Sequence, residues 1–273
     1  MIQGRENPQD TRLRENMARI KNKIVVMSGK GGVGKSTVSA NLAFALALRD
    51  LNVGVLDADI HGPNLPKMFG IDRHRFTGEQ DSIEPVEVLP NLRAASVAFI
   101  GYDPDTALIW RGPMKLGIIK QFLSDIEWGE LDYLVLDTPP GTGDEVLTIC
   151  QSIPDLTGAV IVTTPQDVAI LDSRKSVDFA NKMKLPILGI LENMTDHVFE
   201  DGTNYTMFGS GGGEKAASEL GVPFLGRVPL DPAIVASGDS GRPYVASSPE
   251  SETARIINRV IDAILLSIKG IYS

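Results

Sequence analysis

The segment from Ile24 to Thr37 constrains the fold of this chain more than any other. Four apolar residues, 24–27, are followed by Ser28 and then by the loop GKGGVGKST at 29–37. The loop matches G-x-x-x-x-G-K-[ST], a motif that binds phosphate where a strand runs into it and a helix leaves it. Glycines let the backbone approach a phosphate closely, and the helix adds the positive end of its dipole. The segment therefore predicts a strand, a phosphate-binding loop and a helix in that order.

The rest of the chain continues this alternation of strands and helices. Strands that are apolar throughout and separated by helices indicate a parallel sheet covered on both faces. We therefore expect an α/β fold, a doubly wound, mainly parallel sheet with helices on both faces, as in P-loop NTPases. Apolar runs predict strands at 24–27, 53–56, 92–97, 133–136, 159–162, 187–191 and 224–228, and helical periodicity appears at 35–49, 113–124, 168–183 and 213–220.

The chain of 273 residues fits one domain of this kind. We expect residues 1–22 to be a polar, helical extension and residues 23–273 to be a single P-loop ATPase domain. The apolar face of 254–268 is expected to dock on the sheet, the alternative being a membrane-surface helix. Polar composition predicts surface loops at 72–87, 195–213 and 237–251.

Charge and composition exclude several kinds of partner. The formal net charge of -9 argues against nucleic acid, because that binding requires many Lys and Arg side chains to neutralise phosphates. The N-terminal segment lacks the apolar stretch of a signal peptide, and no run of about 18 apolar residues occurs, so we expect no stable membrane association. The single cysteine, Cys150, fits a reducing compartment. We expect a cytoplasmic protein.

The loop at 29–37 supplies the residues expected to bind ATP. Lys35 is predicted to contact the β and γ phosphates, Ser36 to hold Mg²⁺, and Thr37 to reach the α phosphate. The alternative, a glycine-rich turn that binds nothing, is disfavoured by the strand and helix on either side. The predicted nucleotide-binding residues of this loop are Gly29, Gly31, Gly32, Val33, Gly34, Lys35, Ser36 and Thr37.

Carboxylates follow two of the predicted strands. Asp57 and Asp59 end the strand at 53–56, and Asp137 ends the strand at 133–136. The carboxyl edge of an open α/β sheet is where ligands bind. Asp137 is expected to bond Mg²⁺ through water, with the N–H of Gly141 directed to the γ phosphate. Each Asp taken alone could instead cap a helix or a turn.

Lys30 extends the pattern beyond the generic motif. A lysine at the second position of GKGGVGKST resembles the deviant-Walker P-loop ATPases, which include MinD, ParA, nitrogenase iron protein and the Mrp/ApbC carriers. The resemblance implies a homodimer in which Lys30 reaches the partner's nucleotide, where negative charge builds in the transition state. It also implies that Asp57 belongs to the Mg²⁺ environment and that Asp59 orients the attacking water. The alternative for Lys30 is a solvated loop lysine.

Further strings resemble the Mrp/ApbC-type iron-sulfur cluster carrier ATPases, and the likeness extends from about Lys23 to the last helix. It implies slow, Mg²⁺-dependent ATP hydrolysis, a homodimer, and iron-sulfur client or scaffold proteins as partners. It also implies adenine contacts from Asn193 and from the loop at Pro229, Leu230 and Asp231. The strings are DADIHGPNLP (57–66), WRGPM (110–114), DYLVLDTPPGTGDE (132–145), VTTPQDVAILDSRKSVDF (162–179), LGILENM (188–194), FGSGGG (208–213), FLGRVPLDP (224–232) and SGRPYV (240–245).

The chain departs from this family directly after LENM. Carriers have a C-x-x-C there, through which two subunits bind a [4Fe-4S] cluster, but here TDHVFEDGTNY (195–205) places Phe199 and Gly202 near those positions. Cys150 lies in an apolar helical stretch and is expected to pack in the core. The acidic group around His197, formed with Asp196, Glu200 and Asp201, is either a solvated loop or a hard metal site. A cluster is thus implied by resemblance only, with its ligands missing.

Two functional classes remain open on these grounds. The first is an ATP-hydrolysing iron-sulfur assembly factor, which handles clusters in a diverged way or together with a cysteine-bearing paralogue. The second is a MinD/ParA-like ATP-dependent positioning or interaction switch without a metallocluster. The likeness along the whole chain favours the first class.

Overall fold

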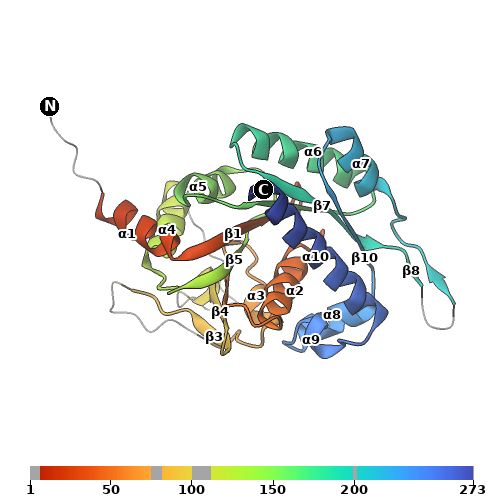
Figure 1. Ribbon diagram of the computed structural model, residues 1–273, viewed down its shortest axis with the longest axis horizontal. Coiled ribbons are helices and arrows are strands. Elements are labelled where there is room, and N and C mark those ends of the chain that lie inside the picture. The colour runs from red at the N-terminus through yellow and green to blue at the C-terminus, as the bar shows by residue number, and fades with distance from the viewer. Residues whose placement is uncertain (1–6, 75–81, 100–111, 199–201, 273) are drawn as a thin grey trace.

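The core of the protein is an eight-stranded sheet, seen in a computed structural model that describes residues 7–74, 82–99, 112–198 and 202–272 (Figure 1). The strand order is β10-β7-β6-β1-β5-β2-β4-β3, and every neighbouring pair is parallel except β3 and β4. The predicted α/β class and all seven predicted strands are confirmed. The strands are β1 (Ile20–Met27), β2 (Val53–Asp57), β3 (Val86–Leu89), β4 (Leu92–Ser96), β5 (Leu131–Asp137), β6 (Gly158–Thr163), β7 (Ile187–Thr195) and β10 (Phe224–Pro229).

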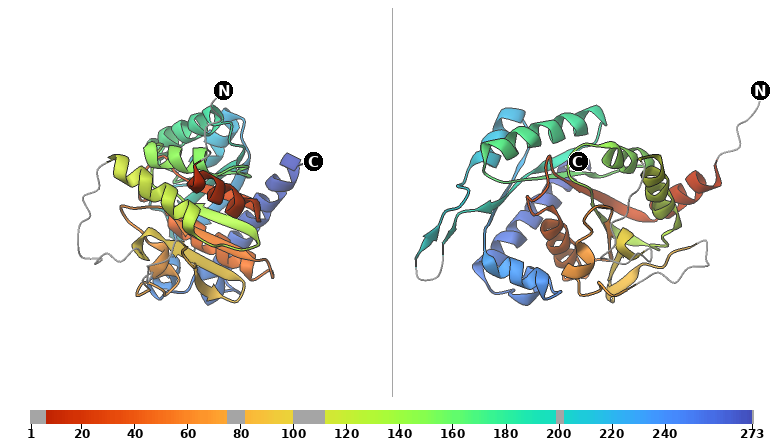
Figure 2. Two further views of the ribbon diagram at one scale, coloured as in Figure 1. Left: turned by 90° about the vertical axis from the view of Figure 1, so that its left-hand side faces the viewer. Right: turned by 180° about the vertical axis from the view of Figure 1, so that it is seen from behind.

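Helices cover both faces of the sheet, as predicted (Figures 1 and 2). Successive side chains of a strand point to opposite faces, so in β1 Ile24 and Val26 join one core and Val25 and Met27 the other. The first core is covered by α2 (Lys35–Ala47), α3 (Leu65–Met68), α8 (Pro232–Asp239), α9 (Tyr244–Ser247) and α10 (Glu252–Tyr272). The second is covered by α1 (Pro8–Ala18), α4 (Gly112–Asp125), α5 (Asp144–Ser152), α6 (Asp167–Lys182) and α7 (Gly212–Leu220).

The N-terminal extension is helical at α1, and it is part of the packed body. Leu13 and Met17 are buried, and the side-chain amide of Asn16 donates to the carbonyls of Ser124 and Ile126. β1 begins at Ile20, before the predicted boundary at residue 22. The division into an extension and a single domain stays a prediction.

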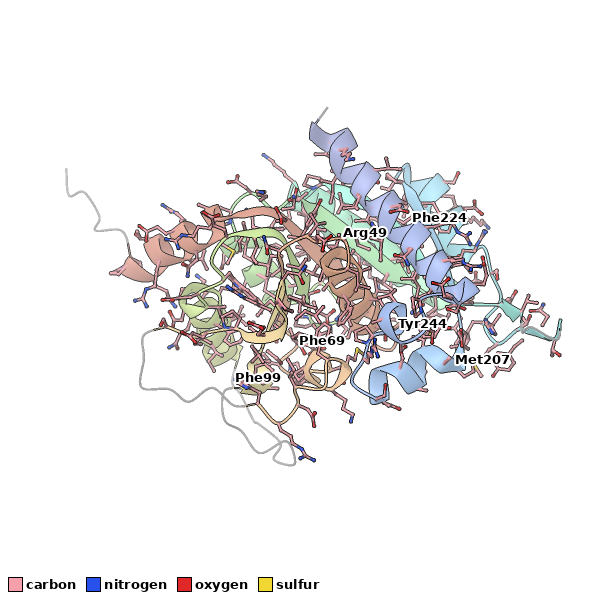
Figure 3. The ribbon with its side chains drawn as sticks, turned by 60° about the horizontal axis from the view of Figure 1, so that its bottom comes forward. Arg49, Phe69, Phe99, Met207, Phe224 and Tyr244 are labelled. Carbon is pink, nitrogen blue, oxygen red and sulfur yellow. The ribbon has the colours of Figure 1, made fainter. Side chains whose placement is uncertain are left out.

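All three predicted surface loops contain some regular structure, and those predictions were wrong in this respect. Segment 237–251 contains α9, and its Tyr244 is buried because the phenol packs on the α2 layer and donates to Asp231 at 3.0 Å (Figure 3). Segment 195–213 contains a hairpin of β8 (His197–Val198) and β9 (Asn204–Tyr205), which projects from the body (Figures 1 and 2). Segment 72–87 ends in β3, and residues 75–81 lie outside the described residues.

The last helix docks on the sheet, as expected for 254–268. α10 packs on β10 and β7, and its apolar stripe, which includes Ile257, Ile261 and Ile264, is buried in the α2-side core. Arg49, just after α2, pairs with Asp262 of this helix at 2.9 Å (Figure 3). None of the helices in the described part of the chain combines the length and hydrophobicity that a membrane crossing requires.

The burial of α10 gives a test of this packing. Ile264 is 1% exposed, so Ile264→Ala leaves a cavity and should lower the free energy of unfolding by about 2–5 kcal/mol. Leu266 on the same helix is 67% exposed, and Leu266→Ala should change it by less than about 0.5 kcal/mol. Urea unfolding followed by circular dichroism measures both values. Equal effects of the two substitutions would contradict the docking of this helix.

Candidate functional site

The glycine-rich loop lies between β1 and α2 and packs closely on its surroundings. Gly34 has φ of 81°, and a Cβ there would lie 2.2 Å from the Asn193 side-chain nitrogen. A Cβ on Gly29 would lie 2.2 Å from the Asp172 carbonyl oxygen of α6. Gly32 is exposed, has φ of 78°, and has open space around it. Glycine is therefore required on the packed side of the loop, while its outer side is open to a ligand.

Strand order brings the loop and both predicted carboxylates together. β5 lies between β1 and β2, and the register places Asp137 beside both Val26 and Asp57. Both carboxylates are fully buried at the carboxyl edge of the sheet. At this edge the β1–β2 and β5–β6 crossovers run in opposite directions along the sheet. Open α/β sheets bind their ligands at such a point.

Three side chains from the start of α2 converge on the Asp137 carboxylate. Lys35 Nζ lies 2.9 Å from Oδ1, and the buried Ser39 hydroxyl donates to the same oxygen at 2.8 Å. The Ser36 hydroxyl donates to Oδ2 at 2.7 Å. The buried ammonium group and two hydroxyl groups thus satisfy a carboxylate that has no access to water.

Asp57 accepts hydrogen bonds from the backbone N–H groups of Leu65 and Asp59, at 3.1 and 3.2 Å. Burial raises the pKa of Asp57 well above its usual range, and the adjacent Asp137 carboxylate raises this pKa further. Two carboxylates with one ammonium group leave the site short of positive charge. Carboxylate and hydroxyl oxygens are ligands that Mg²⁺ prefers, so Ser36, Asp57 and Asp137 fit this ion.

Two residues predicted to act near the phosphates, Asp59 and Gly141, are hydrogen-bonded to backbone groups of the protein in this structure. The Asp59 carboxylate accepts from the backbone N–H groups of His61 and Gly62, at 3.1 and 3.3 Å. The Gly141 N–H donates to the Ser28 carbonyl at 2.8 Å. The Ser28 carbonyl therefore occupies the Gly141 N–H group in this structure, and the contact of that group with the γ phosphate stays a prediction.

The predicted adenine contacts lie at the end of β7 and beyond β10. Asn193 is buried beside the loop, and its side-chain amide donates to the Val33 carbonyl at 2.9 Å. Asp231 caps α8 by accepting from the Ala233 N–H at 2.8 Å, and it also accepts from Tyr244. Pro229, the last residue of β10, is buried. Asn193 is thus brought to the site, Asp231 also has a structural role, and the base contacts stay predictions.

Lys30 lies outside the cluster around Asp137. Its Nζ is 3.5 Å from the side-chain oxygen of Gln166, the residue that precedes α6. The Thr164 hydroxyl lies at the same distance from that oxygen. Lys30 therefore holds its charge at the rim of the loop, beside the first turn of α6.

Sequence reasoning missed Ser39 and Glu192. The signal for Ser39 is a hydroxyl group one helical turn after Lys35, on the same side of the helix. Glu192 is fully buried in β7 and accepts from the backbone N–H groups of Gly211, at 2.7 Å, and Gly213. A Cβ on Gly213 would lie 2.9 Å from the Glu192 side chain. The close approach of Glu192 therefore requires glycine at the last position of the FGSGGG string. Glu192 thereby fixes the base of the projecting hairpin.

The described residues do not offer a ligand set for an iron-sulfur cluster. Cys150 is buried on α5, as predicted, and burial raises the pKa of its thiol to about 11. Nowhere in the described ranges do three His, Cys, Asp or Glu side chains gather closely enough to hold a metal ion. Asp196 accepts from the Ser210 hydroxyl at 3.0 Å. Phe199, Glu200 and Asp201, and the first two residues of the WRGPM string, lie outside the described residues.

Comparisons with known proteins give the family of this chain. Residues 19–265 match the family model ParA, described as NUBPL iron-transfer P-loop NTPase. The chain is 51% identical over 259 residues to the iron-sulfur cluster carrier protein of Methanocaldococcus jannaschii, covering 94% of this chain and 89% of that protein. It is 46% identical over 262 residues to the protein of the same name from Saccharolobus solfataricus, covering 96% and 88%.

Solved structures show the same fold with nucleotides bound. A nucleotide-binding protein from Archaeoglobus fulgidus in complex with ADP is 35% identical, with a TM-score of 0.76 over 89% of this chain and 95% of that one. MinD from Pyrococcus horikoshii, complexed with Mg-ADP, is 25% identical, with a TM-score of 0.68 over 93% and 99%. The predicted resemblance is confirmed, and the chain belongs to the NUBPL iron-transfer P-loop NTPase family.

Proposed function

We propose that this protein binds ATP with Mg²⁺, hydrolyses it slowly as a homodimer, and serves iron-sulfur cluster assembly through a thiol-bearing partner. The observation that carries the first part is the convergence of Lys35, Ser36 and Asp137 directly beneath the glycine-rich loop. A lysine, a hydroxyl and a carboxylate in this arrangement are the residues with which P-loop proteins hold phosphates and Mg²⁺. The ADP in the A. fulgidus relative supports the nucleotide.

Nucleotide binding requires the cluster around Asp137 to exchange partners. Lys35 is to leave Asp137 for the β and γ phosphates, and Ser36 is to turn its hydroxyl to Mg²⁺. Asp57 and Asp137 would hold the ion, and the outer backbone of the loop, at Gly31 and Gly32, would donate to phosphate oxygens. When bound, Mg²⁺ would supply positive charge against the charge that develops on the transferred phosphoryl group. Once their present hydrogen bonds to backbone groups break, Asp59 would orient the attacking water and the Gly141 N–H group would contact the γ phosphate.

The homodimer supplies the remaining positive charge. Lys30 lies at the rim of the loop and makes its bond to Gln166 rather than to the cluster below. A cation at this rim is placed to reach across an interface to a nucleotide on a second copy. A lysine delivered in this way stabilises charge in the transition state as an arginine finger does.

The assembly role is proposed from the relatives named iron-sulfur cluster carrier protein. Because this chain has one cysteine, which is buried, we assign the cluster ligands to a client or scaffold protein. The projecting hairpin is the segment proposed to meet that partner, since Val198 and Tyr205 of its strands expose apolar surface. Met207, two residues after the hairpin, is also exposed (Figure 3). A MinD/ParA-like switch without any metallocluster is the second candidate, favoured by the missing thiols.

The setting proposed for this activity is the cytoplasm. The lone cysteine fits a reducing compartment, and a net charge of -9 disfavours nucleic acid as the partner. We propose no stable membrane association, because the apolar face of α10 is occupied by the sheet.

Loss of the rim lysine tests the dimer mechanism. Lys30→Ala should retain ATP binding and lower the rate of hydrolysis about 10³- to 10⁵-fold, because the charge supplied across the interface is gone. Calorimetry measures ATP binding and phosphate release measures turnover. Lys182→Ala is a matched control, because this lysine is exposed at the far end of α6 and pairs only locally with Asp178.

A second control separates lost binding from lost catalysis. Lys35→Ala should remove ATP binding itself, and its folding is checked by circular dichroism because the substitution leaves Asp137 buried without its cation. If Lys30→Ala turns over ATP at the normal rate, the mechanism across the dimer is wrong.

The missing thiols predict the outcome of cluster reconstitution. Because such clusters are held by four thiolates, the isolated protein incubated anaerobically with iron and sulfide should retain no cluster after desalting. Metal analysis and the thiolate-to-iron absorbance band measure this. About four irons and four sulfides per dimer would contradict the prediction and would make Cys150 and His197 the first residues to substitute.

The buried thiol predicts a specific pH dependence. Since the pKa of Cys150 is raised to about 11, the thiolate fraction and the rate of disulfide exchange should still rise about tenfold per pH unit between pH 8.5 and 10. In the unfolded protein the rate should level off there, because an ordinary cysteine has a pKa of about 8.5. Reaction with an aromatic disulfide reagent, with and without guanidinium, measures both. A native rate that levels off near pH 8.5 would show that this thiol is not buried.

A further inference from the structure

The Asp137 carboxylate accepts hydrogen bonds from three donors, and two of these donors are proposed to bind ATP and Mg²⁺ instead. Lys35 Nζ and the Ser39 hydroxyl bond Oδ1, and the Ser36 hydroxyl bonds Oδ2. Within the ranges that the structure describes, these side chains are the donors to this carboxylate. When ATP and Mg²⁺ bind as proposed, Lys35 moves to the phosphates and Ser36 to the ion. Ser39 is then the donor left on a fully buried carboxylate.

We infer that Ser39 is a positioning residue, which holds Asp137 Oδ1 in the loaded site so that Oδ2 faces the hydration shell of Mg²⁺. The inference rests on the proposed function, because it assigns Ser39 a role toward that same ion. Bonds made by the groups behind a metal site fix the orientation of the groups in front, and their loss costs metal affinity.

The geometry suits Ser39 to this role better than to helix packing alone. The residue is 0% exposed and lies one turn after Lys35, on the side of α2 that faces β5. Its hydroxyl proton has two acceptors in range, the Lys35 carbonyl at 3.2 Å and Asp137 Oδ1 at 2.8 Å. The bond to the carboxylate is the shorter one and is charge-assisted, so it is the stronger of the two.

The need for this bond grows when the nucleotide binds. Asp57 and Asp137 lie side by side on neighbouring strands, both fully buried, and Lys35 is the cation they share in this structure. Once that ammonium group turns to the phosphates, Oδ1 depends on Ser39 for its hydrogen bond. A buried acceptor left without a donor costs free energy. Without Ser39, the Asp137 carboxylate would therefore rotate to bring Oδ1 to another hydrogen-bond donor. The ion would then lose a fixed acceptor for its hydration water.

The test measures metal binding directly, with Mn²⁺ as the probe. Wild-type protein in excess over ADP is titrated with Mn²⁺, and electron paramagnetic resonance counts the free ion. Ser39→Ala should weaken Mn²⁺ binding to the protein–ADP complex about 10- to 100-fold. Its affinity for ADP in the presence of a chelator, measured by calorimetry, should stay within about twofold of wild type, because the Ser39 hydroxyl bonds Asp137, which is proposed to serve the ion, and is assigned no contact with ADP.

Ser173→Ala is the matched control. Ser173 is also a buried helix serine, 1% exposed, and its hydroxyl donates to the Ala169 carbonyl one turn back at 2.8 Å. This substitution removes the same group from a helix without touching Asp137, so Mn²⁺ affinity should match wild type. Ser39→Cys keeps the size of the side chain with a weaker donor, should give an intermediate Mn²⁺ affinity, and replaces Ser39→Ala in the test if that variant does not fold.

The outcomes separate this inference from the function on which it rests. Unchanged Mn²⁺ affinity in Ser39→Ala, or an equal loss in Ser173→Ala, would overturn the positioning role alone. A wild-type protein that binds neither ADP nor Mn²⁺–ADP would overturn the proposed function, and this inference with it.

Discussion

The buried contact between Lys35 and Asp137 is the interaction on which the rest of the site depends. A lysine 6% exposed and an aspartate 0% exposed have both lost their water, and the loss is offset only by the partner and the surrounding hydroxyl groups. Removing one member of such a pair costs about 3–5 kcal/mol, because the other charge stays buried. The contact therefore fixes the start of α2 against the end of β5 while the loop above it stays open.

This contact is also poised for exchange. Asp57 lies next to Asp137, so two carboxylates share one ammonium group, and burial raises the pKa of Asp57 well above its usual range. Additional positive charge at this point would favour the ionised form of both carboxylates. A divalent cation can therefore replace the lysine beside the carboxylates, which frees the lysine for phosphate. The same charge imbalance thus favours both ligands together.

The nucleotide elements and the segment that departs from the family are carried on different parts of the fold. β1, β2 and β5 position the loop and the carboxylates, whereas the hairpin leaves the end of β7 and returns at α7. Its base is fixed by Glu192, while the next residue, Asn193, bonds the loop through Val33. Substitutions in the hairpin can therefore remove thiols without disturbing the phosphate site. The two parts still share the end of β7, where Glu192 and Asn193 are consecutive residues.

The sequence by itself determined seven of the eight strands of the main sheet, the phosphate-binding loop and the family, because these depend on local patterns of apolar residues and on a contiguous motif. It could not determine which strands are neighbours, and the site depends on that: Lys35 and Asp137 are 102 residues apart and meet only because β5 inserts between β1 and β2. For the same reason only the tertiary structure decided that Ser39 bonds Asp137, that the Ser28 carbonyl occupies the Gly141 N–H, and that Tyr244 makes a buried helix of an expected loop. Each of these is a contact across the chain, and a linear pattern records no contact whose partners are set by packing.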